Sequence, residues 1–145
     1  MSTPATPLPS DLMLLPADAE LASVEAVGGG LVLQLSVIAA RRPDPDHPLR
    51  PQDGWVRHVR LVLDQAASPA GPDPTPGRLR RLAVQRPGAA ASTGPWPLTL
   101  PAPFTLAGPL TLQLTLVDGR ALSLDAAALQ LRAGARTVWH ETLAC

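Results

Sequence analysis

Residues 109–131, PLTLQLTLVDGRALSLDAAALQL, carry the clearest structural signal in the chain. Between Leu110 and Leu116, four leucines alternate with polar residues, and this period of two places all four on one face of a strand. Asp118-Gly119 follows, and this dipeptide favours a tight turn between antiparallel strands. The stretch therefore predicts a β-hairpin, and the other segments of the chain are interpreted as covering its leucine face.

The leucine pattern also predicts the register of this hairpin. If the loop were Asp118-Gly119 alone, Thr115 would lie opposite Leu122, and the leucines of the two strands would face opposite ways. A longer loop that begins at Val117 and holds Gly119 at positive φ brings the leucines to one face. The expected pairs are Leu114 with Leu122 and Leu112 with Leu124, and the solvent face carries Thr111, Gln113, Thr115, Ser123 and Asp125.

Alternating hydrophobic residues predict further strands at residues 11–15, 30–41, 55–63, 78–85, 98–106, 129–131 and 137–143. Residues 17–27 fit a helix, because Leu21, Val24 and Val27 are spaced by three, and also fit a strand, because glycines and a valine-rich segment follow. We favour the strand, with a bulge near Ala22 and Ser23 that brings Leu21 and Val24 to the same side.

Three segments rich in proline and glycine, at residues 41–54, 66–77 and 86–97, are predicted to be loops. One helical turn is expected at residues 126–128 and another turn at Gly134. A chain of 145 residues is expected to form one domain, here residues 11–145, after a flexible proline-rich tail at residues 1–10. About eight to ten short strands separated by turns indicate an all-β fold, either a single-domain antiparallel β-sandwich or a small open barrel.

The composition limits the kinds of partner that this chain can have. Hydrophobic residues make up 46% of the sequence but aromatic residues only 3%, so the core must consist mainly of leucine, valine and alanine. The 12 basic residues, all arginine, balance 12 acidic residues, and this zero net charge provides no excess field to attract nucleic acid or a membrane surface. The exclusive use of arginine, with abundant alanine, proline and glycine, indicates a GC-rich bacterial genome.

The cellular compartment is inferred from the cysteine content and from the hydrophobic segments. The single cysteine, Cys145, excludes an internal disulfide and indicates a reducing compartment. No stretch has the length of a membrane span, and no basic residue precedes the apolar segment at residues 11–15, which argues against a secretory signal. We therefore expect a cytoplasmic protein that does not bind membranes.

No combination of residues predicts a catalytic, metal or cofactor site. His140 and Glu141 are neighbours on an expected strand, so their side chains point to opposite faces. A GxSxG turn is absent, and Cys145 has no cationic neighbour in the sequence. Prolines stiffen the one loop that contains several potential ligands, and we expect no metal there. These ligands are Asp44, Asp46, His47 and Asp53. The pattern favours a protein that is not an enzyme.

The proline-restricted loops favour a function in protein binding, because proline reduces the entropy that a loop loses when it binds. We expect a small cytoplasmic bacterial interaction module, of immunity or adaptor type, with another protein as its partner. Two alternatives are a carrier of a small apolar ligand, in a cavity between the sheets, and a hydrolase or isomerase. The candidate partner-binding residues are Trp96, Arg57, His58 and Arg60. Trp96, between two prolines, is either an exposed anchor for the partner or a lid over the open end of the sandwich.

Overall fold

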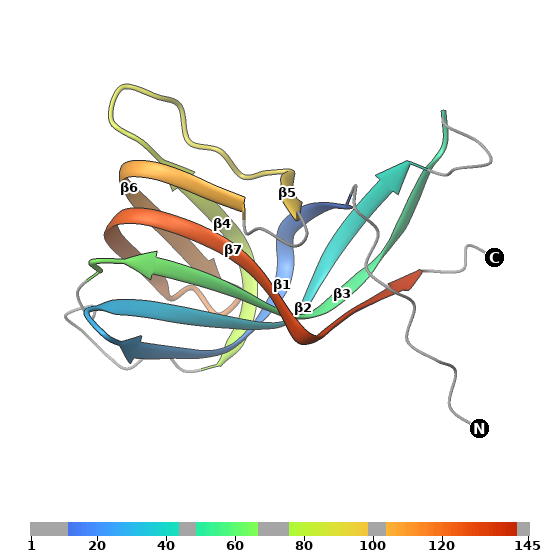
Figure 1. Cartoon of the computed structure of the whole chain (residues 1–145), viewed down its shortest axis with the longest axis horizontal. Helices are drawn as coiled ribbons and strands as arrows, with labels where there is room; N and C mark the ends of the chain where they lie inside the picture. Colours follow the sequence, from blue (N-terminus) through green and yellow to red (C-terminus); the bar gives the residue numbers. More distant parts are fainter. Residues whose placement is uncertain (1–11, 44–48, 67–75, 99–103, 142–145) are drawn as a thin grey trace.

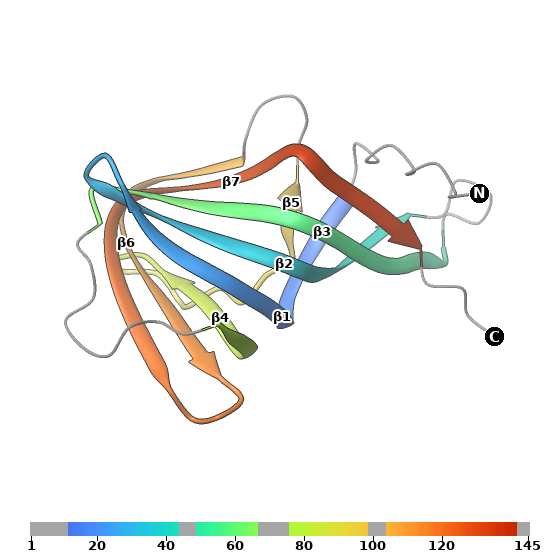
Figure 2. The same cartoon turned by 90° about the horizontal axis from the view of Figure 1, so that it is seen from below.

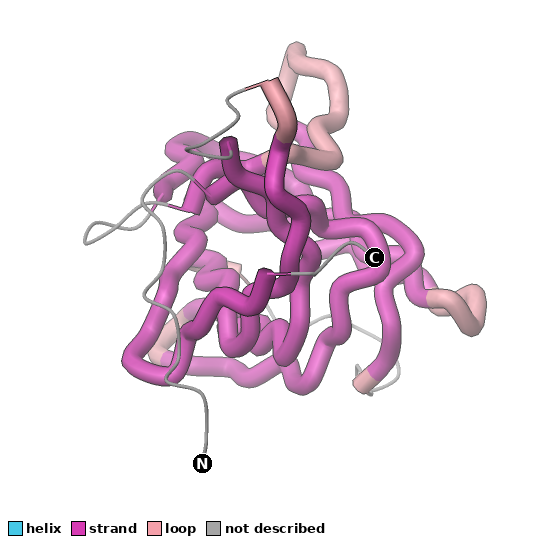
Figure 3. Tube along the Cα trace, turned by 90° about the vertical axis from the view of Figure 1, so that its right-hand side faces the viewer, coloured by secondary structure: helices cyan, strands magenta, loops and turns pink. Residues whose placement is uncertain are grey.

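The computed structural model describes residues 12–43, 49–66, 76–98 and 104–141, apart from the side chains of Ala135 and Glu141. These residues form antiparallel strands and no helix (Figure 3). The strands are β1 (Leu12–Val27), β2 (Gly30–Pro43), β3 (Pro51–Asp64), β4 (Gly77–Gln85), β5 (Trp96–Leu98), β6 (Phe104–Leu116) and β7 (Ala121–Glu141). None of the described segments is a helix of the length and hydrophobicity that crossing a membrane requires.

The prediction of an antiparallel all-β fold is confirmed, but the strands are fewer and longer than expected. Strand β1 has 16 residues and β7 has 21. The expected helical turn at residues 126–128 is wrong, because β7 runs through it. The expected turn at Gly134 is replaced by an irregularity within β7, where residues 134–137 interrupt the pairing with β3. Ala126 pairs with Leu110 of β6, and Ala128 pairs with Asp64 of β3. Pairing along both edges thus overrides the low strand propensity of the alanines.

Six strands form a closed barrel in the order β1-β2-β3-β7-β6-β4, and β5 pairs with the start of β1 (Figures 1 and 2). The ring closes because β1 pairs with β2 along one edge and with β4 along the other, where Glu20 lies opposite Arg78 and Leu21 opposite Gly77. A closed barrel therefore takes the place of the expected β-sandwich or open barrel. Closure pairs strand edges that an open sheet would leave exposed.

The hairpin of β6 and β7 has the predicted register. Leu112 pairs with Leu124 and Leu114 with Leu122, while Thr115 lies opposite Ala121. Gly119 has a φ of +96°, as the three-residue loop requires. The Leu116 N–H donates to the Arg120 carbonyl at 2.8 Å, and the Gly119 N–H donates to the Leu116 carbonyl at 3.0 Å. The leucines of both strands consequently share the face that lines the barrel.

Strand β1 includes residues 17–27, so the strand prediction for this segment is confirmed. Leu21 pairs with Leu35 but Ser23 pairs with Gln34, and Ala22 is the extra residue of a bulge. The bulge brings Leu21, which is fully buried, and Val24, which packs against the core, to the same side. The structure therefore has the bulge at the predicted position.

Leucines fill the interior of the barrel. Leu33 of β2 pairs with Leu61 of β3, Leu61 also pairs with Leu131 of β7, and these side chains are at most 1% exposed. Each fully buried leucine stabilises the fold by roughly 1.5 to 3 kcal/mol relative to an exposed one. The small aromatic content is thus compensated by many aliphatic contacts.

Beyond the barrel, β2, β3 and β7 continue as an extension formed by residues 37–43, 51–57 and 138–141 (Figure 1). Residues 13–15 of β1 pair with residues 39–41 of β2 at its edge. The predicted loop at residues 41–54 is therefore too long, because Arg41 pairs with Asp53 and Pro43 with Pro51. Prolines are tolerated at these strand ends.

The Arg41 guanidinium donates to the Asp53 carboxylate at 2.8 Å, which raises the pKa of Arg41. Asp44, Asp46 and His47 lie outside the described residues.

Candidate functional site

Three of the four predicted partner-binding residues lie together on the outer face of β3. Strict alternation would send the side chains of Arg57 and His58 to opposite faces. In the structure both are exposed, because His58 has a φ of +62° and is an extra residue between the fully buried Val56 and Val59. Arg60 follows on the same face. The bulge at His58 therefore gathers Arg57, His58 and Arg60 on one surface.

The bulge of β3 faces a larger irregularity in β7. Arg57 pairs with Val138 and Val59 pairs with Ala133, so residues 134–137 lie opposite His58 alone. The buried Thr137 stabilises this arrangement, since its hydroxyl donates to the His58 carbonyl at 2.6 Å and accepts from the Gly134 N–H at 2.7 Å. A positive φ at a residue other than glycine costs on the order of 1 to 3 kcal/mol and often marks a functional site.

Trp96 does not belong to this surface. It is only 5% exposed, it pairs with Leu14 of β1, and its side chain is part of the hydrophobic core. Its indole N–H points toward the Ser92 hydroxyl at 3.4 Å. The choice of Trp96 as an exposed anchor is therefore corrected: the structure agrees with the alternative in which this side chain covers the interior.

Trp55 is an exposed aromatic residue that no pattern in the sequence indicated. Its side chain is 40% exposed, and it lines a shallow cavity of about 250 Å³ with Val37, Arg57 and His140. Strict alternation from the inward Val59 would have buried Trp55, and only the bulge at His58 turns it outward. The exposure of Trp55 could be predicted only from a sequence signal for the bulge at His58.

Cross-strand pairing extends the surface around Trp55 over three strands. Trp55 lies opposite Ala39 of β2 and His140 of β7, and Arg57 lies opposite Val37 and Val138. Residues that are directly opposite share a face of the sheet. All of these residues are at least partly exposed. We call this surface the Trp55 face, and it comprises Val37, Ala39, Trp55, Arg57, Val138 and His140.

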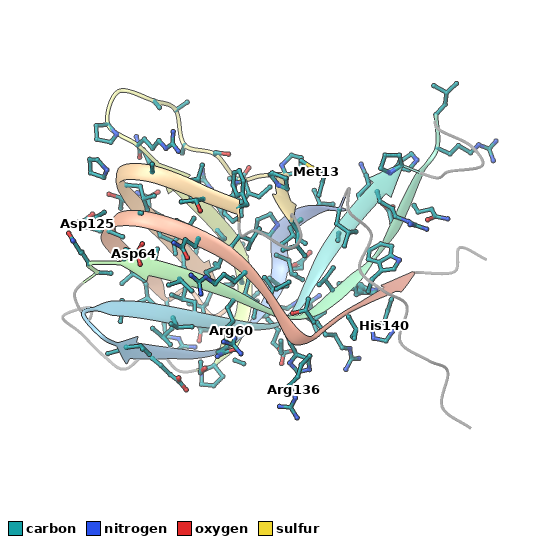
Figure 4. All side chains as sticks on the ribbon, viewed as in Figure 1. Met13, Arg60, Asp64, Asp125, Arg136 and His140 are labelled. Atoms are coloured by element: carbon teal, nitrogen blue, oxygen red, sulfur yellow. The ribbon has the colours of Figure 1, made fainter. Side chains whose placement is uncertain are left out.

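A polar groove of about 600 Å³ adjoins the Trp55 face. It lies between the bulge of β1 and the irregular segment of β7, and Figure 4 shows Arg60 and Arg136 where the barrel meets the extension. The Arg60 guanidinium reaches toward the neighbouring strand β7 and lies 3.7 Å from the position that a Cβ on Gly134 would occupy. The residues that line the groove are Ala22, Ser23, Glu25, Gln34, Leu35, Ser36, His58, Arg60, Gly134 and Arg136.

The outer face of β3 and β7 is rich in positive charge, although the chain as a whole has zero net charge. Arg57, Arg60, Arg132 and Arg136 are all exposed, and no carboxylate of a described side chain forms an ion pair with them. Arg60 lies directly opposite Arg132 on the neighbouring strand. Like charges in this position destabilise a sheet. The fold therefore maintains a local concentration of positive charge at some cost.

Within the described part of the chain, no three side chains of His, Cys, Asp or Glu gather in a way that would hold a metal ion. The groove contains a single carboxylate, Glu25, beside two guanidinium groups and an imidazole. Such a set can bind and orient an anionic group through charge-assisted hydrogen bonds. No family model, curated protein or solved structure matches this chain.

Proposed function

We propose that this chain is a small, non-catalytic interaction module, cytoplasmic and of immunity or adaptor type, which binds another protein through the Trp55 face. The observation that carries the proposal is the exposure of Trp55, at 40%, in the middle of a paired sheet surface. Tryptophan and arginine are the residue types most enriched among those that dominate the energy of protein interfaces. Trp55 and Arg57 supply both on one face.

The position of Trp55 separates it from the other large hydrophobic side chains that are exposed. Val27 lies where β1 turns into β2, Val117 lies in the hairpin loop, and Leu49 lies between β2 and β3. Exposure at such turns is ordinary. Trp55 instead lies between neighbours on both sides of a rigid sheet, where a partner can contact it with little loss of entropy. The rigidity of the surface therefore supports a binding role.

Charge suggests the chemistry of the partner. Arg57 and His140 flank Trp55, and further arginines continue along the same side of β3 and β7. A complementary partner would place an apolar side chain over Trp55 and carboxylates near the arginines, because opposite potentials raise the association rate and disfavour wrong partners. We therefore propose an acidic protein surface as the partner.

The packing of the barrel favours this proposal over a carrier of a small apolar ligand. Leu33, Leu61 and Leu112 fill the interior and are fully buried, whereas the cavities described above open on the outside of the sheet. A carrier needs an apolar cavity of several hundred cubic ångströms that encloses most of its ligand. The leucine-lined interior is occupied by side chains instead.

The experiment is affinity purification from the native host, followed by binding measurements with the protein that co-purifies. Trp55→Ala should leave the protein folded, with a loss of about 1 to 3 kcal/mol in unfolding free energy from the buried part of the side chain. It should weaken partner binding at least tenfold, or about 1.4 kcal/mol. Val117→Ala is the matched control, because Val117 is also exposed but lies at the far hairpin loop. A partner that binds both variants equally would contradict the proposal.

A further inference from the structure

The groove beside the Trp55 face has the composition of a site for a small anion. Arg60 and Arg136 supply guanidinium donors, His58 supplies an imidazole, and Ser23 and Ser36 line the same space, with the Ser36 hydroxyl 3.5 Å from the Glu20 carbonyl oxygen. Arginine pairs with phosphate and carboxylate groups through two parallel hydrogen bonds, and hydroxyl groups donate further ones. These donors come from four strands, β1, β2, β3 and β7.

We infer that this groove binds a phosphate group, held by Arg60 and Arg136 with His58 and the two serines as further partners. This inference goes beyond the proposed function, because the groove is separate from Trp55 and binding of an anion there does not depend on the Trp55 face. The Trp55 face takes an apolar side chain, whereas the groove takes a dianion. Two guanidinium groups neutralise the charge of one phosphate dianion.

The backbone around the groove supports a binding role. The bulge at Ala22 in β1 and the segment 134–137 in β7 each bend the sheet away from regular pairing, and the groove lies between them. His58 is held at positive φ, and Thr137 fixes its carbonyl at 2.6 Å. Bulges commonly redirect side chains next to binding sites. Here they turn His58 and Arg60 toward one space.

The charges around the groove also favour an anion. Arg60 lies opposite Arg132, whose guanidinium donates to the amide oxygen of Gln130 at 2.8 Å and does not neutralise Arg60. Glu25 is the one carboxylate that lines the groove, against the cations of Arg60 and Arg136. A bound phosphate would offset the repulsion between Arg60 and Arg132. This repulsion is otherwise unexplained by the fold.

The test is titration of the full chain with inorganic phosphate, followed by two-dimensional NMR and calorimetry at constant ionic strength with chloride as the reference ion. We expect saturable shifts centred on residues 58–60 and 134–137. The double variant Arg60→Gln, Arg136→Gln should bind at least tenfold more weakly. The matched control is Arg80→Gln, Arg86→Gln, which removes two exposed arginines from β4 and the segment after it and should bind like wild type.

A second variant tests whether phosphate binding needs the open space of the groove, and it leaves the charge unchanged. Gly134→Leu should weaken phosphate binding at least tenfold by placing a side chain against the Arg60 guanidinium, and it should fold, since a Cβ at this position comes no closer than 3.7 Å to Arg60. The inference is overturned if chloride produces the same shifts, if both double variants bind alike, or if Gly134→Leu binds like wild type.

A further arm identifies the source of the phosphate group. A phosphoserine peptide and its unphosphorylated form are titrated separately into the wild type. Either order of affinity between the phosphopeptide and inorganic phosphate supports the site, because inorganic phosphate binds in both cases. Binding of the phosphopeptide more tightly than inorganic phosphate would indicate a modified partner chain, and equal or weaker binding would indicate the free ion. Binding of the unphosphorylated peptide as tightly as the phosphopeptide would count against a phosphate site.

Discussion

Replacing Gly119 with valine isolates the contribution of a single backbone conformation to the hairpin. Gly119 has a φ of +96°, and a Cβ built on it meets no atom within 4 Å. The substitution therefore creates no steric clash with other residues, and its cost comes from the backbone alone. Forcing a residue with a side chain into the left-handed region costs about 1 to 2 kcal/mol, and a β-branched residue lies at the upper end.

The expected shift in melting temperature follows from the size of the chain. With an unfolding entropy of about 2.1 cal/mol/K per residue, a loss of 1 to 2 kcal/mol in a chain of 145 residues lowers the melting temperature by about 3 to 7 °C. Circular dichroism with thermal and urea unfolding measures this directly. Gly119→Asn is the control, because asparagine tolerates positive φ and should lose less than half as much stability.

The register argument would be refuted by either of two results. One is a Gly119→Val protein with the stability of wild type, which would show that the loop does not require positive φ at this position. The other is an asparagine variant that is destabilised as much as the valine variant. In that case the loss would come from the change of residue 119 as such and not from its conformation.

Three further predictions concern the core, the extension and the hairpin loop. Trp96→Ala should reduce the unfolding free energy by about 3 to 5 kcal/mol, as large buried truncations do, measured by urea unfolding. Gly54→Ala should cost about 1 to 3 kcal/mol by overpacking and alter the tryptophan fluorescence, because the new Cβ would clash with the His140 carbonyl oxygen and lie 2.5 Å from the Trp139 ring. The Arg120 N–H donates a hydrogen bond to the Asp118 carboxylate, and this bond lowers the pKa of Asp118. The hydrogen bond therefore stabilises the fold above about pH 4, and this stabilisation disappears as the pH falls through the lowered pKa of the folded state. The stability difference between wild type and Asp118→Asn should therefore be larger at pH 7 than in strong acid, and an unchanged difference would contradict this.

Local patterns predicted the parts of this fold that local physics determines. The alternation from Leu110 to Leu116 and the Asp118-Gly119 turn determine a register within about twenty residues of chain, and β6 and β7 have it. Barrel closure depends instead on Glu20 and Leu21 meeting Arg78 and Gly77. No periodicity within either segment indicates that pairing, since it is set by how far the whole sheet curls.

In the candidate site, too, local sequence predicted some features, and pairing between distant segments determined others. The prediction selected Arg57, His58 and Arg60, and all three are exposed on one face. It could not foresee that Trp55 is exposed, because the outward turn depends on one positive φ at His58, and histidine in mid-strand carries no signal for a bulge. Trp96 was selected from the prolines around it, yet pairing with Leu14 places it in the core. Side-chain exposure in this region therefore depends on tertiary pairing.

The position of β7 in the sheet has a consequence for how the protein is made. Strands β1 to β6 leave the ribosome before β7, yet β7 lies between β3 and β6 and is hydrogen-bonded to both. Until β7 emerges, the nascent chain presents unpaired edges on β3 and β6, and such edges promote aggregation. We expect translation intermediates that end before residue 121 to require chaperone protection, and barrel closure to be a late and slow event of folding, because its contacts are distant in sequence.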